Sequence, residues 1–108
     1  MALTRSFRET IKEQLADANF RREFLRGAVS RMVAGDLETA KAILREYING
    51  TLGFVALGKA LVKSPKSLMR MLSRDGNPQA RNLFEMVAYF QKAEGTALEV
   101  HAIDVTDA

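Results

Sequence analysis

The fold of this chain is decided by residues 54–90, which read FVALGKALVKSPKSLMRMLSRDGNPQARNLFEMVAYF. Leu57 and Leu61 are four residues apart and mark the buried side of a first short helix. Gly58 lies beside this apolar pair, and because it has no side chain it lets another backbone segment approach closely, although it weakens the helix itself. We therefore expect another part of the chain to pack tightly against this helix.

A second short helix is predicted to begin at Ser64 and Pro65. The Ser64 hydroxyl can accept a hydrogen bond from a free backbone amide of the first turn, and Pro65 suits the first helical position because no amide is needed there. One side of this helix is apolar and faces inward: Leu68, Met71 and Leu72. The opposite side carries small and cationic side chains: Lys66, Ser67, Arg70 and Arg74. The helical repeat therefore separates a buried back from a basic front.

A short helix of this kind can enter the major groove of DNA. There, charged side chains meet phosphates, and side chains near the start of the helix reach the edges of the bases. The alternative is an ordinary amphipathic helix pair whose basic face is solvated. The pattern alone does not choose between these two interpretations.

A third helix is predicted after Gly76, with Asn77 as its cap and Pro78 as its first residue. The free amides at such a helix start, with Gln79 and Arg81 nearby, could hold a phosphate. Capping alone explains the same residues without DNA. The side chains expected to make this helix largely core are Leu83, Phe84, Val87, Ala88 and Phe90.

The composition is that of one globular domain. The chain has 108 residues, of which 47% are apolar and 27% are charged, so a single core is possible and disorder is not indicated. The formal net charge is only +3, but residues 50–92 hold seven Lys and Arg against two acidic residues, whereas residues 93–108 hold four acidic residues and no Lys or Arg. The positive charge is thus concentrated on the helix pair, as a polyanionic partner would require.

Three helices are predicted before this stretch. Apolar residues spaced four apart indicate a helix over 6–17, capped by Ser6, and a second over 19–33. Gly35 indicates a helix end, and Asp36 a cap for a third helix that ends near residue 50. We expect the aromatic pair at positions 20 and 24 to lie in the core between the first two helices. A groove for a binding partner is the alternative.

The last segment, residues 96–108, changes character. Leu98 and Val100 alternate with polar residues, and Ile103 and Val105 follow in the opposite phase. Alternation of this kind is typical of a β-strand, and a lone strand needs a partner. Pairing with the same strand of a second subunit is one expectation, and a tail that lies along its own domain is the other.

No arrangement of residues points to an enzyme. The chain has no cysteine, which excludes disulfides, thiolate nucleophiles and cysteine-ligated metals. His101 is the single histidine and lacks companions for a catalytic or metal site, and no glycine-rich phosphate loop occurs. We expect no cofactor and no metal. No segment has the character of a signal peptide or a membrane span, so we expect a cytoplasmic protein without a membrane partner.

Together, these features resemble the helix-turn-helix of the λ-repressor-like, or XRE-type, DNA-binding domains. More narrowly, SPKSLMRML at 64–72, GNP at 76–78 and LEV at 98–100 resemble the prophage-type addiction-module antidote proteins, which are antitoxins that also regulate transcription. The resemblance covers about residues 36–100. One departure is Val62, which stands where this fold usually has glycine in the turn. Because valine disfavours a positive φ, we expect the turn to adopt another conformation, which would change the docking angle of the second helix.

The apolar spacing and the resemblance together predict an all-α fold in three parts: an N-terminal helical extension over residues 1–35, a helix-turn-helix DNA-binding domain of the λ-repressor-like kind over 36–95, and a C-terminal strand or tail over 96–108. The resemblance also implies a regulator that binds double-stranded operator DNA as a homodimer, represses its own operon and binds a toxin protein. The alternative is a protein-interaction module, for a toxin or another partner, whose helix-turn-helix is only scaffold.

On the first interpretation, three side chains of the second helix enter the major groove: Lys66, Ser67 and Arg70. Arg70 is the best candidate to recognise a guanine because its guanidinium can bond two acceptors at once, and Met69 could border a thymine methyl group. Five further residues are expected to hold phosphates: Lys63, Ser64, Arg74, Asn77 and Gln79.

Overall fold

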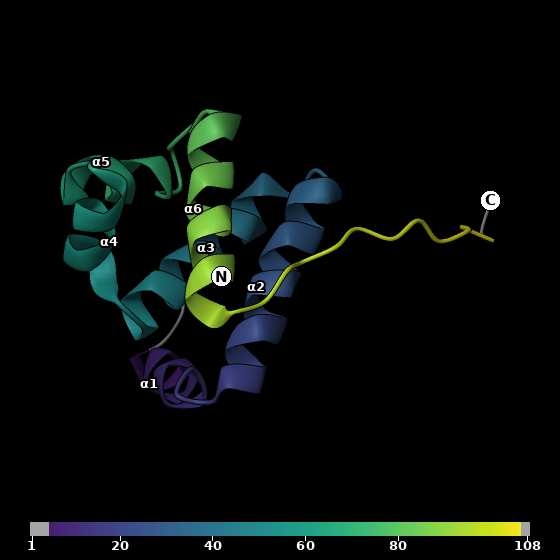
Figure 1. Cartoon of the computed structure of the whole chain (residues 1–108), viewed down its shortest axis with the longest axis horizontal. Coiled ribbons are helices and arrows are strands. Elements are labelled where there is room, and N and C mark those ends of the chain that lie inside the picture. Colours follow the sequence, from purple (N-terminus) through teal and green to yellow (C-terminus); the bar gives the residue numbers. More distant parts are fainter. Residues whose placement is uncertain (1–4, 107–108) are drawn as a thin grey trace.

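The computed structural model describes residues 5–106 of the chain, with side chains from residue 7 onward. Six helices follow one another (Figure 1): α1 (Arg5–Gln14), α2 (Ala18–Val33), α3 (Leu37–Gly50), α4 (Gly53–Leu61), α5 (Pro65–Met71) and α6 (Ala80–Glu94). No strand occurs within residues 5–106, so the predicted all-α class is confirmed. No helix in this range combines the length and the apolarity that crossing a membrane requires.

The ends of α2 and α3 follow from local capping chemistry. Gly35 ends α2 with a φ of +84°, and Asp36 begins α3 by accepting a hydrogen bond from the Thr39 amide at 3.2 Å, both as predicted. Hydrogen bonds from Thr39 also lower the pKa of Asp36. The prediction for α1 was wrong at both ends. Ser6 lies inside α1 rather than before it, and Asp17 caps α2 instead of closing α1.

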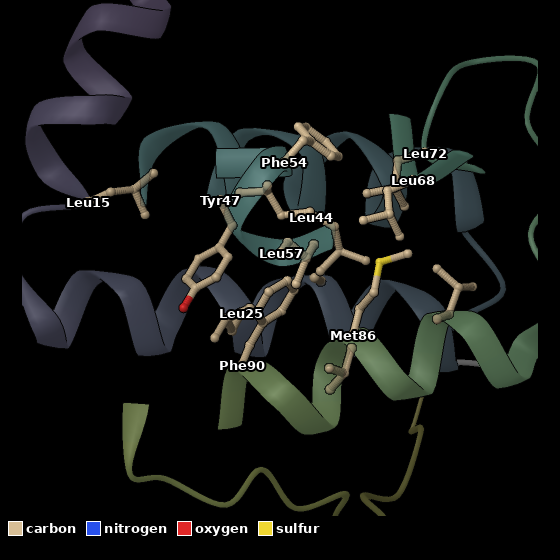
Figure 2. Packing of buried hydrophobic residues seen from close by; sticks show 14 residues of the cluster. Leu15, Leu25, Leu44, Tyr47, Phe54, Leu57, Leu68, Leu72, Met86 and Phe90 are labelled. Atoms are coloured by element: carbon tan, nitrogen blue, oxygen red, sulfur yellow. The ribbon is translucent and has the colours of Figure 1, made fainter. Parts of the chain in front are cut away.

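Helix α3 is the centre of the core, and α1, α2 and α4 all pack against it. Its side chains Leu44, Tyr47 and Ile48 are almost completely buried. Figure 2 shows the Tyr47 ring against Phe90 of α6. The centroids of the two rings are 4.7 Å apart. One continuous apolar cluster therefore joins all six helices.

The buried face of α6 differs in part from the prediction. Its buried side chains are Leu83, Met86, Val87 and Phe90. Phe84 is 59% exposed, and Ala88 is exposed as well, so the expectation that these two residues are core was wrong. In a helix each residue is turned by about 100° from the one before, so a buried face through 83, 87 and 90 turns 84 and 88 outward.

Phe20 and Phe24 stack on α2 with their ring centroids 5.6 Å apart. Both rings are half-buried and pack against the central cluster. The pair thus packs against the core, but the predicted place between the first two helices is not confirmed, because the helix that carries the pair packs chiefly against α3.

A polar cluster holds the helices together at the end of the core opposite α5. The Glu94 side chain is only 7% exposed and receives the Arg21 Nε at 2.8 Å and the Tyr47 hydroxyl at 2.6 Å. Arg21 also donates to the backbone oxygens of Leu15 and Ala16 in the turn that precedes α2. Burial, followed by the hydrogen bond to Glu94, raises the pKa of Tyr47. The cluster thus connects α2, α3 and α6 with the end of α1.

The segment after α6 is a tail and not a strand. Gly95 ends α6, and residues 96–106 have no regular structure. The Leu98 amide donates to the Gln91 side chain at 2.7 Å, but every residue from Glu99 to Thr106 is exposed, and the tail leaves the body in Figure 1. The predicted strand is therefore absent from the described part of the chain, and Asp107 and Ala108 lie outside the described residues.

Candidate nucleic-acid interface

The turn between α4 and α5 contains the one described non-glycine residue with a positive φ. Val62 has a φ of +56° and a ψ of +51°, which is the left-handed helical conformation. The Lys63 amide, which follows it, bonds to the Gly58 oxygen at 2.9 Å. The expectation that valine would force another turn was therefore wrong. The Val62 side chain is 91% exposed, so it meets little of the surrounding chain and the strain stays local.

Gly58 allows this turn to fold directly back onto α4. A Cβ atom at position 58 would lie 2.6 Å from the Lys63 carbonyl oxygen, and the Pro65 ring is also within contact distance. No side chain fits there. The predicted close approach of another segment to Gly58 is confirmed, and the segment is the turn that leads into α5.

Because valine is strained at Val62, we expect Val62→Gly to stabilise the protein. The left-handed conformation costs about 1–2 kcal/mol for a residue with a Cβ, and glycine removes this strain. Because glycine also has more conformational freedom in the unfolded chain, the net stabilisation is about 1 kcal/mol. The thermal midpoint should rise by roughly 4–8 °C in a differential scanning calorimeter. The matched control is Val55→Gly in the body of α4, where valine is also exposed and glycine should destabilise the helix. Equal destabilisation by both changes would contradict strain at Val62.

Helix α5 begins and packs as predicted. The Ser64 side chain accepts a hydrogen bond from the Ser67 amide at 3.0 Å, and Pro65 is the first helical residue. Leu68 and Leu72 are completely buried, and Figure 2 shows them pointing from α5 toward Met86 of α6. The back of α5 is therefore part of the core.

The front of α5 is open to solvent and carries free positive charge. Lys66 and Arg70 are exposed, and within residues 5–106 neither side chain forms a hydrogen bond or an ion pair. Met69 is 47% exposed, and Ser67 is half-buried at the start of the helix. The four residues predicted to face base edges therefore lie on one short helix, and its two cations have no carboxylate partner.

The five predicted phosphate ligands form a less uniform set. Lys63 is half-buried, with its Nζ 3.8 Å from a carboxylate oxygen of Glu85, so part of its charge is already compensated. The Ser64 hydroxyl is used in capping and donates to the Ser67 hydroxyl at 2.9 Å. The other three are exposed: Arg74, Asn77 and Gln79. A cleft of about 350 Å³ brings Asn77 beside Ser67 and Arg70.

The prediction for the start of α6 was wrong. Helix α6 begins at Ala80, with Gln79 in the capping position and no side-chain hydrogen bond to the free amides. Asn77 and Pro78 lie in the non-helical segment before it. Asn77 therefore does not act as a helix cap, and the free amides that it was expected to flank lie further along the chain.

Helix α6 starts later than predicted because of Lys41 of α3, a residue that the sequence pattern did not single out. Its side chain is completely buried, and its Nζ donates to the backbone oxygens of Ser73 at 3.0 Å, Arg74 at 3.2 Å and Gly76 at 2.6 Å. Gly76 is pressed against the end of α5, since a Cβ there would lie 2.1 Å from the Arg70 oxygen. The chain is thus held in a loop through residue 76, and α6 starts only after it.

Arg45, one helical turn after Lys41 on α3, reinforces this contact by donating from its guanidinium to the Leu72 oxygen. Together the two cations bond to backbone oxygens of residues 72–76, the segment that directly follows α5. A lysine and an arginine four residues apart on a helix are common on solvated faces. Sequence reasoning missed this role because the pattern does not show that this face of α3 is turned inward.

Comparison with models of protein families, with curated proteins and with solved structures finds no match for this chain. A function for this surface is therefore inferred from the residues that form it: an open cationic front, a buried back and an end that is anchored to α3. Within the described residues, no cluster of metal-ligating side chains offers a competing site.

Proposed function

We propose that the chain is a sequence-specific DNA-binding regulator in which α4, the turn at Val62 and α5 form a helix-turn-helix. Helix α5 is its recognition helix and would lie in the major groove of operator DNA. The observation that carries this proposal is that Lys66 and Arg70 project, exposed and unpaired, from a helix whose opposite side is buried. A rigid helix with a free cationic face satisfies both requirements of major-groove recognition, namely position and charge.

The distribution of charge around α5 supports a polyanionic partner. Residues 50–92 hold seven Lys and Arg against two acidic residues. Of these seven, one is paired with a carboxylate across the described chain, namely Lys63 with Glu85. Unpaired cations around the recognition helix release counterions when they meet phosphates, and this release drives non-specific affinity and fast association.

The anchoring of α5 supports recognition of specific bases in addition to non-specific electrostatic attraction to DNA. Lys41 and Arg45 hold the end of the helix against α3, so its front keeps one orientation relative to the core. Side chains on a rigid element can discriminate between bases because a misplaced bidentate hydrogen bond loses most of its strength. We assign base contacts to Lys66, Ser67 and Arg70, with Met69 beside them.

Arg70→Ala tests this assignment. Loss of one bidentate contact to guanine should weaken binding to a selected operator by about 1–3 kcal/mol and relax the preference at one base pair. Binding to random DNA should change much less. The measurement is a gel-shift or fluorescence-anisotropy titration on both DNAs at several salt concentrations, with the operator selected from a random library by the wild-type protein.

Lys63→Ala is the contrasting variant because Lys63 is assigned to phosphate and not to a base. It should weaken specific and random DNA alike and lower the salt slope by about 0.9 or less, because Glu85 already compensates part of its charge. Arg70→Ala losses of equal size on operator and random DNA would exclude a base-reading role for Arg70. Absence of any DNA binding at low salt would exclude the proposed function as a whole.

An antitoxin role is the more specific form of the proposal. It is supported by the resemblance of residues 64–72, 76–78 and 98–100 to the antidote proteins of addiction modules, and it implies autorepression, a toxin partner and action in the cytoplasm. A short reading frame for a toxin adjacent to the gene, whose product co-purifies with this chain, is the expected result. A co-purifying partner combined with no DNA affinity would instead support the interaction module, in which α4 and α5 are scaffold.

A further inference from the structure

An apolar groove lies far from α5, between α2, the start of α6 and the first tail residues. Its volume is about 340 Å³, and six of its lining side chains are Val29, Met32, Val33, Leu83, Phe84 and Val100. Val33 is 64% exposed and Phe84 is 59% exposed. Large apolar side chains that gather around one concave surface are typical of an interaction site.

The tail carries the matching apolar side chains. Ile103 is 83% exposed and Val105 is 80% exposed, and the tail that bears them extends away from the body in Figure 1. Within residues 5–106, no backbone group from Glu99 to Thr106 forms a hydrogen bond. The exposed apolar side chains of this segment would therefore gain free energy from burial against another surface.

The path of the tail leads these side chains away from the groove of the same molecule. Leu98 packs on the core and Val100 lines the groove. Every residue from Glu99 to Thr106 is exposed, and the tail extends away from the body in Figure 1. Ile103 and Val105 therefore do not cover the groove of their own chain in this structure.

We propose that two copies of this chain exchange tails, so that Ile103 and Val105 of each copy occupy the groove beside Phe84 of the other. The occupant is a second copy because the same chain carries both the groove and the apolar pair that needs one. Charge fits this arrangement. Asp104 lies between Ile103 and Val105, and Arg81, three residues before Phe84 on α6, is exposed with no ion-pair partner within residues 5–106. Reciprocal exchange also closes the assembly as a two-fold dimer.

The exchange leaves the proposed DNA surface free. Helices α4 and α5 lie at one end of the long axis of the molecule, and the tail leaves from the other side (Figure 1). That this dimer supplies the two-fold axis for operator binding rests on the proposed function. Its test contains no DNA, so failure of the dimer and failure of DNA binding are separate results.

Sedimentation-velocity measurements over a wide concentration series provide the test. The wild-type chain should dimerise, and a groove variant, Phe84→Glu, and a tail variant, Ile103→Asp with Val105→Asp, should each weaken the dimer by about tenfold or more. The matched control is Val55→Glu on α4, where an exposed valine outside the groove receives the same charge and dimerisation should not change. The tail variant alters only exposed, irregular residues, so its fold is not at risk.

Mixing the two variants distinguishes exchange from any other contact of the same residues. The groove variant supplies an intact tail and the tail variant supplies an intact groove, so the mixture should form heterodimers under conditions in which neither variant forms homodimers. A wild-type chain that stays monomeric would overturn the proposal. So would a dimer that survives both variants, or a mixture that shows no heterodimer.

Discussion

Glu94→Ala is expected to lower the free energy of unfolding by about 3–5 kcal/mol, because it removes one partner of a buried ion pair. The Glu94 side chain is 7% exposed and Arg21 is 25% exposed, so solvent replaces little of what is lost. The change leaves the Arg21 guanidinium without its carboxylate and the Tyr47 hydroxyl without its acceptor. A domain of this size has about 5–15 kcal/mol in total, so the variant should be close to unfolding.

Urea denaturation followed by circular dichroism measures this effect. Glu85→Ala is the matched control, because Glu85 also pairs with a cation but is 43% exposed, and such pairs contribute about 1 kcal/mol or less. Tyr47→Phe should cost about 1 kcal/mol, the value of one hydrogen bond, while keeping the ring against Phe90. If Glu94→Ala lowered the free energy of unfolding no more than Glu85→Ala, the polar cluster around Glu94 would not stabilise the packing of the helices.

Lys41→Met is expected to cost about 2–4 kcal/mol of stability, because it leaves the part-buried backbone oxygens of Arg74 and Gly76 without a donor and takes one of two donors from the Ser73 oxygen. Methionine keeps most of the apolar stem and removes only the ammonium group, whose bonds to the Ser73, Arg74 and Gly76 oxygens are all 3.2 Å or shorter. If the proposed function holds, operator affinity should also fall by about tenfold in the folded variant, because the end of α5 loses its anchor.

The control for Lys41 is its own ion-pair partner. Glu38 lies 3.1 Å from the Lys41 Nζ but is 65% exposed, so Glu38→Gln should change stability by less than about 1 kcal/mol. Denaturation of both variants, and operator binding at a temperature where both are folded, provide the measurements. Equal effects of the two changes would show that the exposed ion pair, and not the three carbonyl contacts, explains the role of Lys41.

The helix starts and ends that sequence predicted correctly are those set by neighbouring residues. Asp36 accepts from an amide three residues later, Ser64 does the same, and Pro65 adds a preset φ. Such bonds form wherever the local backbone allows them. The predicted start of α6 was wrong because a distant residue, Lys41, holds the loop before α6, so that Asn77 and Pro78 stay outside the helix.

On the candidate surface, too, local spacing predicted some features and contacts between distant segments decided the others. The 3.6-residue period separates Leu68 and Leu72 from Lys66 and Arg70, and the structure keeps that separation. The period does not show that Lys63 meets Glu85 on another helix. It also does not show where the buried face of α6 ends, so Phe84 was assigned to the core although it lines an open groove.

By itself, the sequence determined the all-helical class, the order of the helices and the basic front of α5, because caps, glycine, proline and apolar spacing act between residues close together in the chain. Only the tertiary structure decided where Val62, Lys41, Phe84 and the tail are placed. Val62 adopts a strained positive φ in a turn where glycine would have no strain. Lys41 points inward from its helix and donates to carbonyl oxygens more than 30 residues away. These outcomes depend on contacts between segments that are distant in the sequence, and no local pattern contains them.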